Sequence, residues 1–172
     1  MLNSSKRILI LGSGGCGKST LAKQLGTITD LPVIHLDRYY WSEDWTPMPS
    51  DEWEALQRCL VNEPQWIIDG NYGYTLDIRM KACDTLIFLD YSSALCTLRA
   101  LKRMLFSGGI RDDLGQEERF DPKFLSWIFN FPKGGRKLIL DAIKNYPEKK
   151  VFHFRRPREL KQFLRHLDKK RS

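Results

Sequence analysis

The sequence lacks several features that would assign it to a class at once. Its 172 residues contain no apolar run of about 18 residues, the length that a membrane-spanning helix needs, so we expect no membrane partner. The first residues lead directly into a predicted strand and leave no room for a signal peptide, which predicts a cytoplasmic protein. Without internal repeats or low-complexity segments, the chain is expected to form a single domain over residues 1–172.

Cysteine and histidine are scarce. The four cysteines never occur in the C-x-x-C spacing of zinc or redox sites, so we expect reduced thiols and no cysteine-based metal site. Of the three histidines, His35 and His153 lie within predicted strands, where packing is the expected role. No Ser/His/Asp or Cys/His arrangement, helix-turn-helix, zinc-finger or RNA-recognition signature is recognisable.

Positive charge is unevenly distributed along the chain. The net charge is +7, and residues 144–172 hold 11 Lys and Arg against 3 Asp and Glu, whereas residues 1–143 hold 17 against 18. A solvated final helix explains this excess. The alternative is a C-terminal surface that contacts DNA.

Short apolar segments alternate with helical patterns. We expect strands at residues 7–11, 33–36, 66–68, 85–89 and 150–154. We expect helices after the first strand, behind a cap at Ser50, at about 75–82, 94–106, 122–130 and 136–145, and from residue 157. This alternation predicts a three-layer α/β/α fold in which a five-stranded parallel sheet carries helices on both faces. Such sheets bind ligands at the carboxyl ends of their strands, where Asp37, Asp69 and Asp90 lie.

The most specific motif follows the first predicted strand. Residues 12–19 read G-S-G-G-C-G-K-S and match the Walker A pattern G-x-x-x-x-G-K-[ST]. The backbone N–H groups of such a loop surround phosphates, and the helix that follows adds its positive end. The residues expected to contact ATP here are Gly12, Ser13, Gly14, Gly15, Cys16, Gly17, Lys18, Ser19 and Thr20. We expect Lys18 to reach the β- and γ-phosphates and Ser19 to ligate Mg²⁺.

Three carboxylates are candidates for roles beside the phosphates. Asp69 is a candidate to hold Mg²⁺ through water, and Asp37 to do the same or to orient an acceptor hydroxyl. Asp90 ends the most hydrophobic strand, where a turn-forming role is equally expected. The sequence leaves open which of the three contacts the metal.

A charged segment with a Gly-Gly pair, at about residues 104–121, has the features of a mobile lid. Arg99 and Arg103 share a helix face, and Arg111 follows beyond the glycines. Guanidinium groups on such a segment close over phosphates and exclude water, so we expect Arg103 and Arg111 to act in catalysis. The alternative is that Arg99 and Arg103 form surface ion pairs.

An aromatic cluster of Tyr39, Tyr40, Trp41 and Trp45 comes just after Asp37. Packing of a long loop is the default role for such residues. The alternative is a pocket for the acceptor, such as a base or another planar group.

These features together resemble the nucleoside-monophosphate-kinase-like branch of the P-loop proteins, the adenylate kinase relatives. More narrowly, the chain resembles the bacterial DNA topology modulation or FlaR-like proteins. The resemblance covers nearly the whole chain and is carried by residues 12–19, His35-Leu36-Asp37, Asp69-Gly70-Asn71-Tyr72, Arg99 with Arg103, and Arg111-Asp112-Asp113. It implies an acceptor-side or metal-linked role for Asp69 and phosphate contacts for the arginines. It also implies adenine contacts near Arg156 and Pro157.

The acceptor side departs from the family pattern. Adenylate-kinase-type sequences continue D-G with Phe or Tyr, Pro and Arg, whereas this chain has Asn71-Tyr72-Gly73. The arginine that would bind an acceptor phosphate is missing there, and Arg79 and Arg38 are candidates to replace it.

The motifs therefore predict an ATP-binding, Mg²⁺-dependent kinase. It would transfer the γ-phosphoryl group to a small acceptor such as a nucleotide or nucleoside. The alternative is a nucleotide-dependent protein that modulates DNA topology through residues 144–172, with weak ATPase activity at most. The sequence specifies neither the acceptor nor the oligomeric state.

Overall fold

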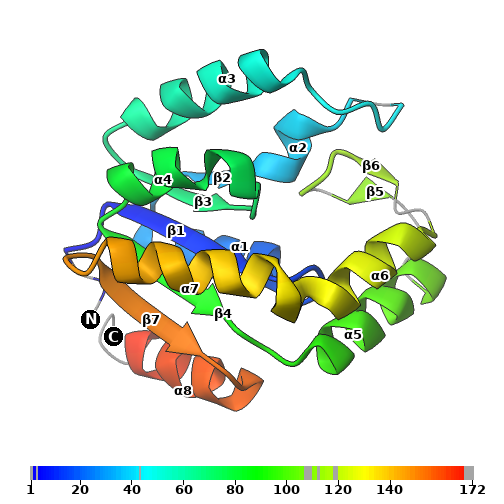
Figure 1. The fold of residues 1–172 in the computed structure, drawn as a ribbon. Helices are drawn as coiled ribbons and strands as arrows, with labels where there is room; N and C mark the ends of the chain where they lie inside the picture. Colours follow the sequence, from blue (N-terminus) through cyan, green and yellow to red (C-terminus); the bar gives the residue numbers. More distant parts are fainter. Residues whose placement is uncertain are drawn as a thin grey trace.

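A five-stranded parallel sheet forms the centre of the molecule (Figure 1). The computed structural model describes residues 2, 4–42, 44–106, 110–111, 113–117 and 120–168, and at residues 110, 111 and 116 it describes the backbone alone. The sheet has the order β2-β3-β1-β4-β7. Its strands are β1 (Arg7–Gly12), β2 (Val33–His35), β3 (Trp66–Asp69), β4 (Thr85–Leu89) and β7 (Lys150–Phe154).

Helices cover both faces of this sheet. The α-helices in the described part of the chain are α1 (Lys18–Thr29), α2 (Leu36–Tyr40), α3 (Ser50–Asn62), α4 (Leu76–Ala82), α5 (Ser93–Phe106), α6 (Pro122–Asn130), α7 (Gly135–Asn145) and α8 (Pro157–Asp168). Two short 3₁₀ helices, η1 (Gly73–Thr75) and η2 (Phe131–Lys133), precede α4 and α7. None of the described helices is both long and apolar enough to cross a bilayer.

The central strand shows why the sheet is buried on both sides. Successive side chains of a strand point to opposite faces. Ile8 and Ile10 of β1 pack into a core with α1 and α8, whereas Leu9 and Leu11 pack into a second core with α3, α4 and α7. All four side chains are fully buried, which is why the strand is a continuous apolar run without alternating polar residues.

The predicted fold class is confirmed. The structure has the expected parallel sheet with helices on both faces, and all five predicted strands are present. Two local expectations were wrong: the strand predicted at 33–36 ends at His35, with Leu36 starting the short helix α2, and Ser50 is the first helical residue of α3 behind the N-cap Pro49.

The segment predicted as a lid contains a small hairpin. Strands β5 (Ile110–Arg111) and β6 (Gln116–Glu117) pair antiparallel. At the turn between them, a Cβ placed on Gly115 would lie 3.7 Å from the Arg38 side chain of α2, so the hairpin lies beside the segment that carries Asp37. The glycines of the predicted hinge, Gly108 and Gly109, lie outside the described residues.

Candidate active site

The Walker A segment forms the turn between β1 and α1, at the carboxyl end of the central strand. Gly17 stands at the N-cap of α1 with φ of 98°, in the left-handed region that favours glycine. Lys18 is the first residue of the helix, and its Nζ donates a hydrogen bond to the Ser13 carbonyl at 3.0 Å. The strand–loop–helix context that the motif requires is therefore present.

Two glycines of the loop permit close packing against α5 and α6, two helices from the second half of the chain. A Cβ on Gly15 would lie 2.3 Å from the Cys96 carbonyl oxygen of α5. A Cβ on Gly14 would lie 2.6 Å from the Phe124 ring of α6. Cys16 is buried, and burial raises the pKa of its thiol.

A cavity of about 340 Å³ lies against this loop, and we call it the phosphate cavity. It is lined by Gly14, Gly15, Gly17, Lys18, Ser19, Thr20, Lys23, Gln24, Asp37, Arg103, Asp113 and Phe124. The structure thus brings Arg103 and Asp37 to the loop, as the sequence reasoning expected. It also brings Asp113 there, a carboxylate from the hairpin turn that sequence reasoning noted as part of the family resemblance and gave no role.

Other residues with predicted ATP contacts lie away from that lining. Gly12, Ser13 and Cys16 are buried within the loop. Arg99 is exposed on α5, with its guanidinium carbon 5.8 Å from the centre of the Tyr91 ring. Arg156 is also exposed, and its backbone N–H donates to Glu159 at the start of α8. The side chain of Arg111 lies outside the described residues.

Asp69 and His35 form a pair between neighbouring strands. Asp69 is 3% exposed, and its Oδ1 lies 2.7 Å from His35 Nδ1. Burial alone would lower the pKa of His35, but the hydrogen bond and the charge of Asp69 raise that pKa above its ordinary value. Asp69 is absent from the linings of the two cavities described here, so its predicted contact with Mg²⁺ would run through water.

Asp90 has partners that account for its position at the end of β4. Its two carboxylate oxygens accept from Arg136 Nε at 2.8 Å and Arg136 Nη2 at 2.9 Å. His153 Nε2 lies 2.8 Å from Asp90 Oδ2. Burial opposes ionisation, but the bonds from Arg136 and His153 lower the pKa of Asp90. Of the roles left open for Asp90, the structure favours a structural one: it ties β4 and β7 to α7.

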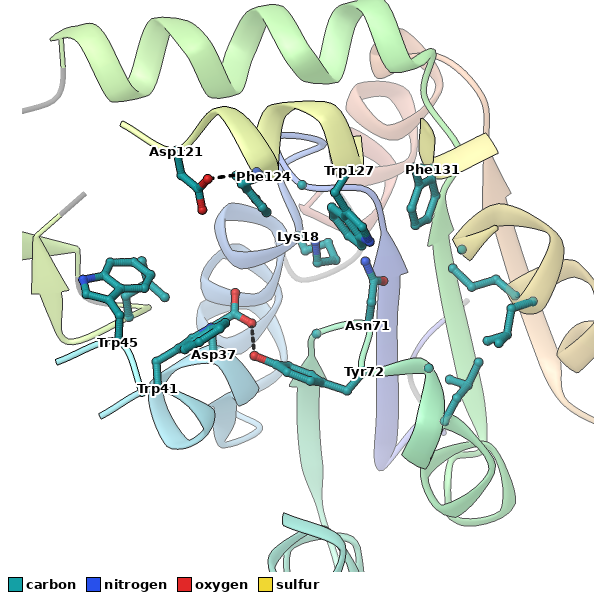
Figure 2. Close-up of a pocket in the computed structure, with 18 of the residues that line it drawn as sticks. Lys18, Asp37, Trp41, Trp45, Asn71, Tyr72, Asp121, Phe124, Trp127 and Phe131 are labelled. Atoms are coloured by element: carbon teal, nitrogen blue, oxygen red, sulfur yellow. Dashed lines mark hydrogen bonds between the residues drawn. The ribbon is translucent and has the colours of Figure 1, made fainter. Parts of the chain in front are cut away.

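A second cavity, of about 530 Å³, adjoins the phosphate cavity and is rich in aromatic side chains (Figure 2). We call it the aromatic cavity. Its larger or polar lining residues are Lys18, Asp37, Trp41, Trp45, Asn71, Tyr72, Leu76, Met104, Leu114, Asp121, Phe124, Trp127, Phe131, Leu138 and Ile139. Of the aromatic cluster that follows Asp37, Trp41 and Trp45 face this cavity. Tyr40 packs edge-on against Trp41 and Trp53, and Tyr39 is 43% exposed.

Asp37 is held in place by a tyrosine from the neighbouring loop. Tyr72 donates a hydrogen bond from its hydroxyl to Asp37 Oδ1 at 2.6 Å (Figure 2). Burial, and then the negative charge of Asp37, raise the pKa of Tyr72, so the phenol stays protonated and remains a donor. The carboxylate therefore has a defined orientation at the junction of the two cavities.

Asn71 lies in the loop that follows β3, at residues 70–72, which we call the acceptor-side loop, and connects it to the phosphate loop. Its Oδ1 accepts from the Gly12 backbone N–H at 3.1 Å, and its Nδ2 donates to the Gly12 carbonyl at 2.6 Å. Sequence reasoning placed Asn71 both in the family resemblance and at the start of the departure from it, and missed this role. The contact spans 59 positions, so no local spacing pointed to it.

The Arg79 side chain forms hydrogen bonds with the backbone and is absent from the lining of the aromatic cavity. It is fully buried, and its guanidinium donates to the carbonyls of Gly70 at 2.8 Å, Asn71 at 2.5 Å and Tyr72 at 2.8 Å. Burial lowers its pKa to about 9. The hypothesis that Arg79 replaces the missing acceptor-phosphate arginine is therefore wrong. Arg38, the other candidate, is exposed and absent from the described linings.

The same architecture occurs in solved structures. Shikimate kinase from Acinetobacter baumannii, in complex with shikimate, superposes with a TM-score of 0.59 at 12% identity, covering 99% of this chain and 97% of the other. Shikimate kinase from Bacteroides thetaiotaomicron gives 0.55 at 15% identity, covering 96% and 98%. The fold is that of a P-loop NTPase. At these identities the likeness establishes the fold alone. No protein-family profile matches the chain, and no curated protein matches it.

The donor set of the phosphate cavity suits magnesium. Its lining includes the Ser19 hydroxyl and the carboxylates of Asp37 and Asp113, which are hard oxygen ligands of the kind that Mg²⁺ prefers. The described residues contain no group of three or more His, Cys, Asp or Glu that could hold a metal by themselves. Mg²⁺ is commonly bound by one or two carboxylates together with substrate phosphates and water.

Proposed function

We propose that this protein is a P-loop kinase that transfers the γ-phosphoryl group of ATP to a hydroxyl group of a small acceptor. The observation that carries the proposal is the junction of the two cavities, which share Gly14, Lys18, Asp37 and Phe124. A triphosphate on the loop and an acceptor among the aromatic residues would meet at a lysine and a carboxylate. Those are the groups that phosphoryl transfer needs at the reacting atoms.

In the proposed step, the Asp37 carboxylate takes the proton of the acceptor hydroxyl group. A lone pair of the hydroxyl oxygen forms the new bond to the γ-phosphorus, and the bond from that phosphorus to the β–γ bridging oxygen breaks, leaving its electron pair on ADP. The hydroxyl proton passes to the Asp37 carboxylate and then to solvent. The hydrogen bond from Tyr72 keeps the carboxylate oriented for this transfer.

Positive groups would stabilise the transferred phosphoryl group. Lys18 and the loop N–H groups bind the phosphates, and Arg103 approaches them from α5, where it lines the phosphate cavity. We keep Arg111 as a second lid arginine, and Arg99 and Arg156 as outer nucleotide contacts. Ser19 and Asp113, and Asp69 through water, would hold Mg²⁺, which would neutralise phosphate charge.

A solved relative in fold supports a small acceptor. The Acinetobacter baumannii protein, a shikimate kinase, carries shikimate. By analogy of fold, the aromatic cavity here is the proposed acceptor site. We also retain, as a prediction, the resemblance to the bacterial DNA topology modulation proteins.

The test is a transfer assay with γ-labelled Mg-ATP and a panel of nucleosides, nucleotides and hydroxylated metabolites. Label should appear on an acceptor with the parent protein and disappear in Lys18→Ala. Lys6→Ala is the matched control, because Lys6 is exposed at the other end of β1. Label released only as inorganic phosphate, or ATP binding without turnover, would overturn the proposal and favour a nucleotide-gated binding protein.

A further inference from the structure

The aromatic cavity has two aromatic walls that come from distant parts of the chain (Figure 2). We call them the α2-side wall, formed by Trp41, Trp45 and Tyr72, and the α6-side wall, formed by Phe124, Trp127 and Phe131. Lys18 and Asp37 lie between the walls, at the junction with the phosphate cavity (Figure 2). A molecule placed between the walls would therefore present its edge to the reacting groups.

Contacts among the rings hold each wall in place. On the α6 side, Phe124 and Trp127 stack with centroids 5.8 Å apart and planes 11° apart, and Phe131 meets Trp127 edge-on at 5.6 Å. On the α2 side, the ring centroids of Trp41 and Trp45 lie 5.9 Å apart. Rigid aromatic surfaces on both sides of a cavity favour flat ligands, because a planar π-system can contact both walls at once.

The charges in the same cavity disfavour an anionic ligand. Among its described lining residues, Asp37 and Asp121 carry carboxylates, and Lys18 carries the one ammonium group. Asp121 is the N-cap of α6, and its side chain accepts hydrogen bonds from the backbone N–H groups of Lys123 at 2.9 Å and Phe124 at 3.1 Å. Lys18 also lines the phosphate cavity, where the donor requires it. A phosphate group between the walls would meet two negative groups in a partly enclosed site.

Arg79 of α4, which contacts residues 70–72, supplies no free guanidinium to the cavity. The Arg79 side chain is fully buried, and its guanidinium donates hydrogen bonds to the three backbone carbonyls of residues 70–72. In the segment where the adenylate-kinase pattern has an arginine, this chain has Asn71 and Tyr72, and both line the aromatic cavity.

From these walls and charges we infer that the acceptor is an uncharged, planar molecule with a hydroxyl group, such as a nucleoside or another heteroaromatic alcohol. A nucleoside monophosphate or a non-planar hydroxy acid would be a poor acceptor. The inference rests on the proposed function for the step that follows binding. It concerns the ligand of the aromatic cavity, which can be tested without turnover.

The first experiment measures binding in the absence of ATP by quenching of tryptophan fluorescence, since Trp41, Trp45 and Trp127 line the cavity. The uncharged planar probes are adenosine, guanosine, thymidine and pyridoxine. The charged or non-planar probes are the three matching 5′-monophosphates and shikimate. At least one uncharged probe should bind about tenfold or more tightly than its monophosphate, the effect of about 1.4 kcal/mol. The inference would be overturned if a monophosphate or shikimate bound more tightly than every uncharged planar probe, or if no uncharged planar probe bound at all.

Variants on one helix then test the stacking role of the α6-side wall. Trp127 and Phe129 are both exposed on α6, at 45% and 62%, but only Trp127 is part of the cavity lining. By calorimetry, Trp127→Ala should weaken binding of the preferred probe by about 5- to 150-fold, the range for loss of one stacking aromatic. Trp127→Phe should recover most of the affinity and Trp127→Leu should not, while Phe129→Ala should match the parent. Equal affinity in Trp127→Leu and Trp127→Phe would remove the need for a planar ligand. Thermal unfolding confirms that each variant is folded.

The two proposals fail in different ways. Transfer of label to shikimate, lost in Lys18→Ala, would leave the kinase proposal standing and overturn the planar, uncharged acceptor. Transfer to the phosphate group of a monophosphate would overturn the hydroxyl acceptor as well. Tight binding of a planar probe with no label transferred to it would support the ligand class and overturn the phosphotransfer.

Discussion

At the scale of single residues, Asp37 should be the residue whose replacement most clearly separates chemistry from binding. Its carboxylate lies at the junction of the cavities and accepts from Tyr72. We expect Asp37→Asn to lower kcat by about 10²–10⁴-fold, because the amide cannot take the acceptor proton, with ATP affinity little changed. Steady-state kinetics and an ATP titration measure both. Tyr72→Phe, which keeps the carboxylate, should lose less, and an unchanged kcat in Asp37→Asn would exclude it as the base.

Gly15 is the loop residue with the least space for a side chain. A Cβ there would lie 2.3 Å from a backbone oxygen of α5, and the backbone has φ of 73°. We expect Gly15→Ala to lower the free energy of unfolding by about 1–3 kcal/mol and to weaken ATP binding, because the loop must move away from α5. Gly134→Ala is the control, since nothing lies within 4 Å of its Cβ position and its φ is negative. Chemical denaturation that gave the two variants equal stability would contradict this reading.

At the scale of elements, α6 links the phosphate loop to the acceptor site. Its residues Phe124 and Ile128 touch the position of Gly14, and its N-cap is Asp121. We expect Asp121→Ala to cost about 0.5–2 kcal/mol of unfolding free energy and to weaken ligand binding in the aromatic cavity, because the cap fixes the first turn. Asp121→Asn keeps a capping oxygen and should retain most of the stability. Thermal unfolding and probe titration would show the difference, and equal losses in both variants would point to charge instead of capping.

The strand pair β2–β3 carries a pH-dependent contact between His35 and Asp69. The pKa of His35 is raised above 6.5, so the protonated pair contributes its full stabilisation below that value. The contribution is lost as the pH rises through the raised pKa. The difference in free energy of unfolding between the parent and His35→Gln should therefore shrink as the pH rises from below 6.5 through the raised pKa. A difference that grows over this range would show that His35 is neutral in the folded protein.

Element prediction succeeded where the signal was local and strong. Strand β4 has five consecutive buried residues, Thr85–Leu89, and its sequence is apolar throughout apart from the threonine. Helix α2 was missed because it has five residues, two of them tyrosines, and it owes its form to its surroundings. Leu36 is fully buried in the core below it, and Tyr40 packs on Trp53 and Tyr72. Propensity is weak evidence over so short a span, and such packing overrides it.

At the scale of the whole molecule, the basic C-terminal segment is the feature that separates a kinase from a DNA-acting protein. Helix α8 buries Phe163 and Leu167, while Lys161 and Arg165 are exposed on it. Lys169, Lys170 and Arg171 lie outside the described residues.

Neutralising these five cations to Gln should leave phosphotransfer at the parental level, because Lys161 and Arg165 lie on α8, which contributes no residue to the two described cavity linings. Transfer assays on the parent and the variant check this. In parallel, duplex DNA binding is measured at two salt concentrations. Salt-sensitive DNA binding that the variant loses, with no transfer activity in the parent, would favour the DNA-topology alternative over the kinase.

The sequence by itself determined the parts of this protein whose signals are contiguous. A phosphate loop is recognisable because its glycines, lysine and serine must follow one another for backbone amides to surround an anion. Buried parallel strands are recognisable because both of their faces are covered, which leaves unbroken apolar runs. The carboxyl-end position of Asp37 then followed from the direction of the strands.

Only the tertiary structure decided what surrounds the loop. Asn71 hydrogen-bonds to Gly12, and Arg136 hydrogen-bonds to Asp90. The two aromatic walls line one cavity although Trp45 and Phe124 are some eighty positions apart in the chain. A sequence pattern records which residues are near one another along the chain, not which side chains a folded sheet brings together. That is why Arg79 was open to interpretation as an acceptor contact until burial and three carbonyl partners assigned it to the backbone.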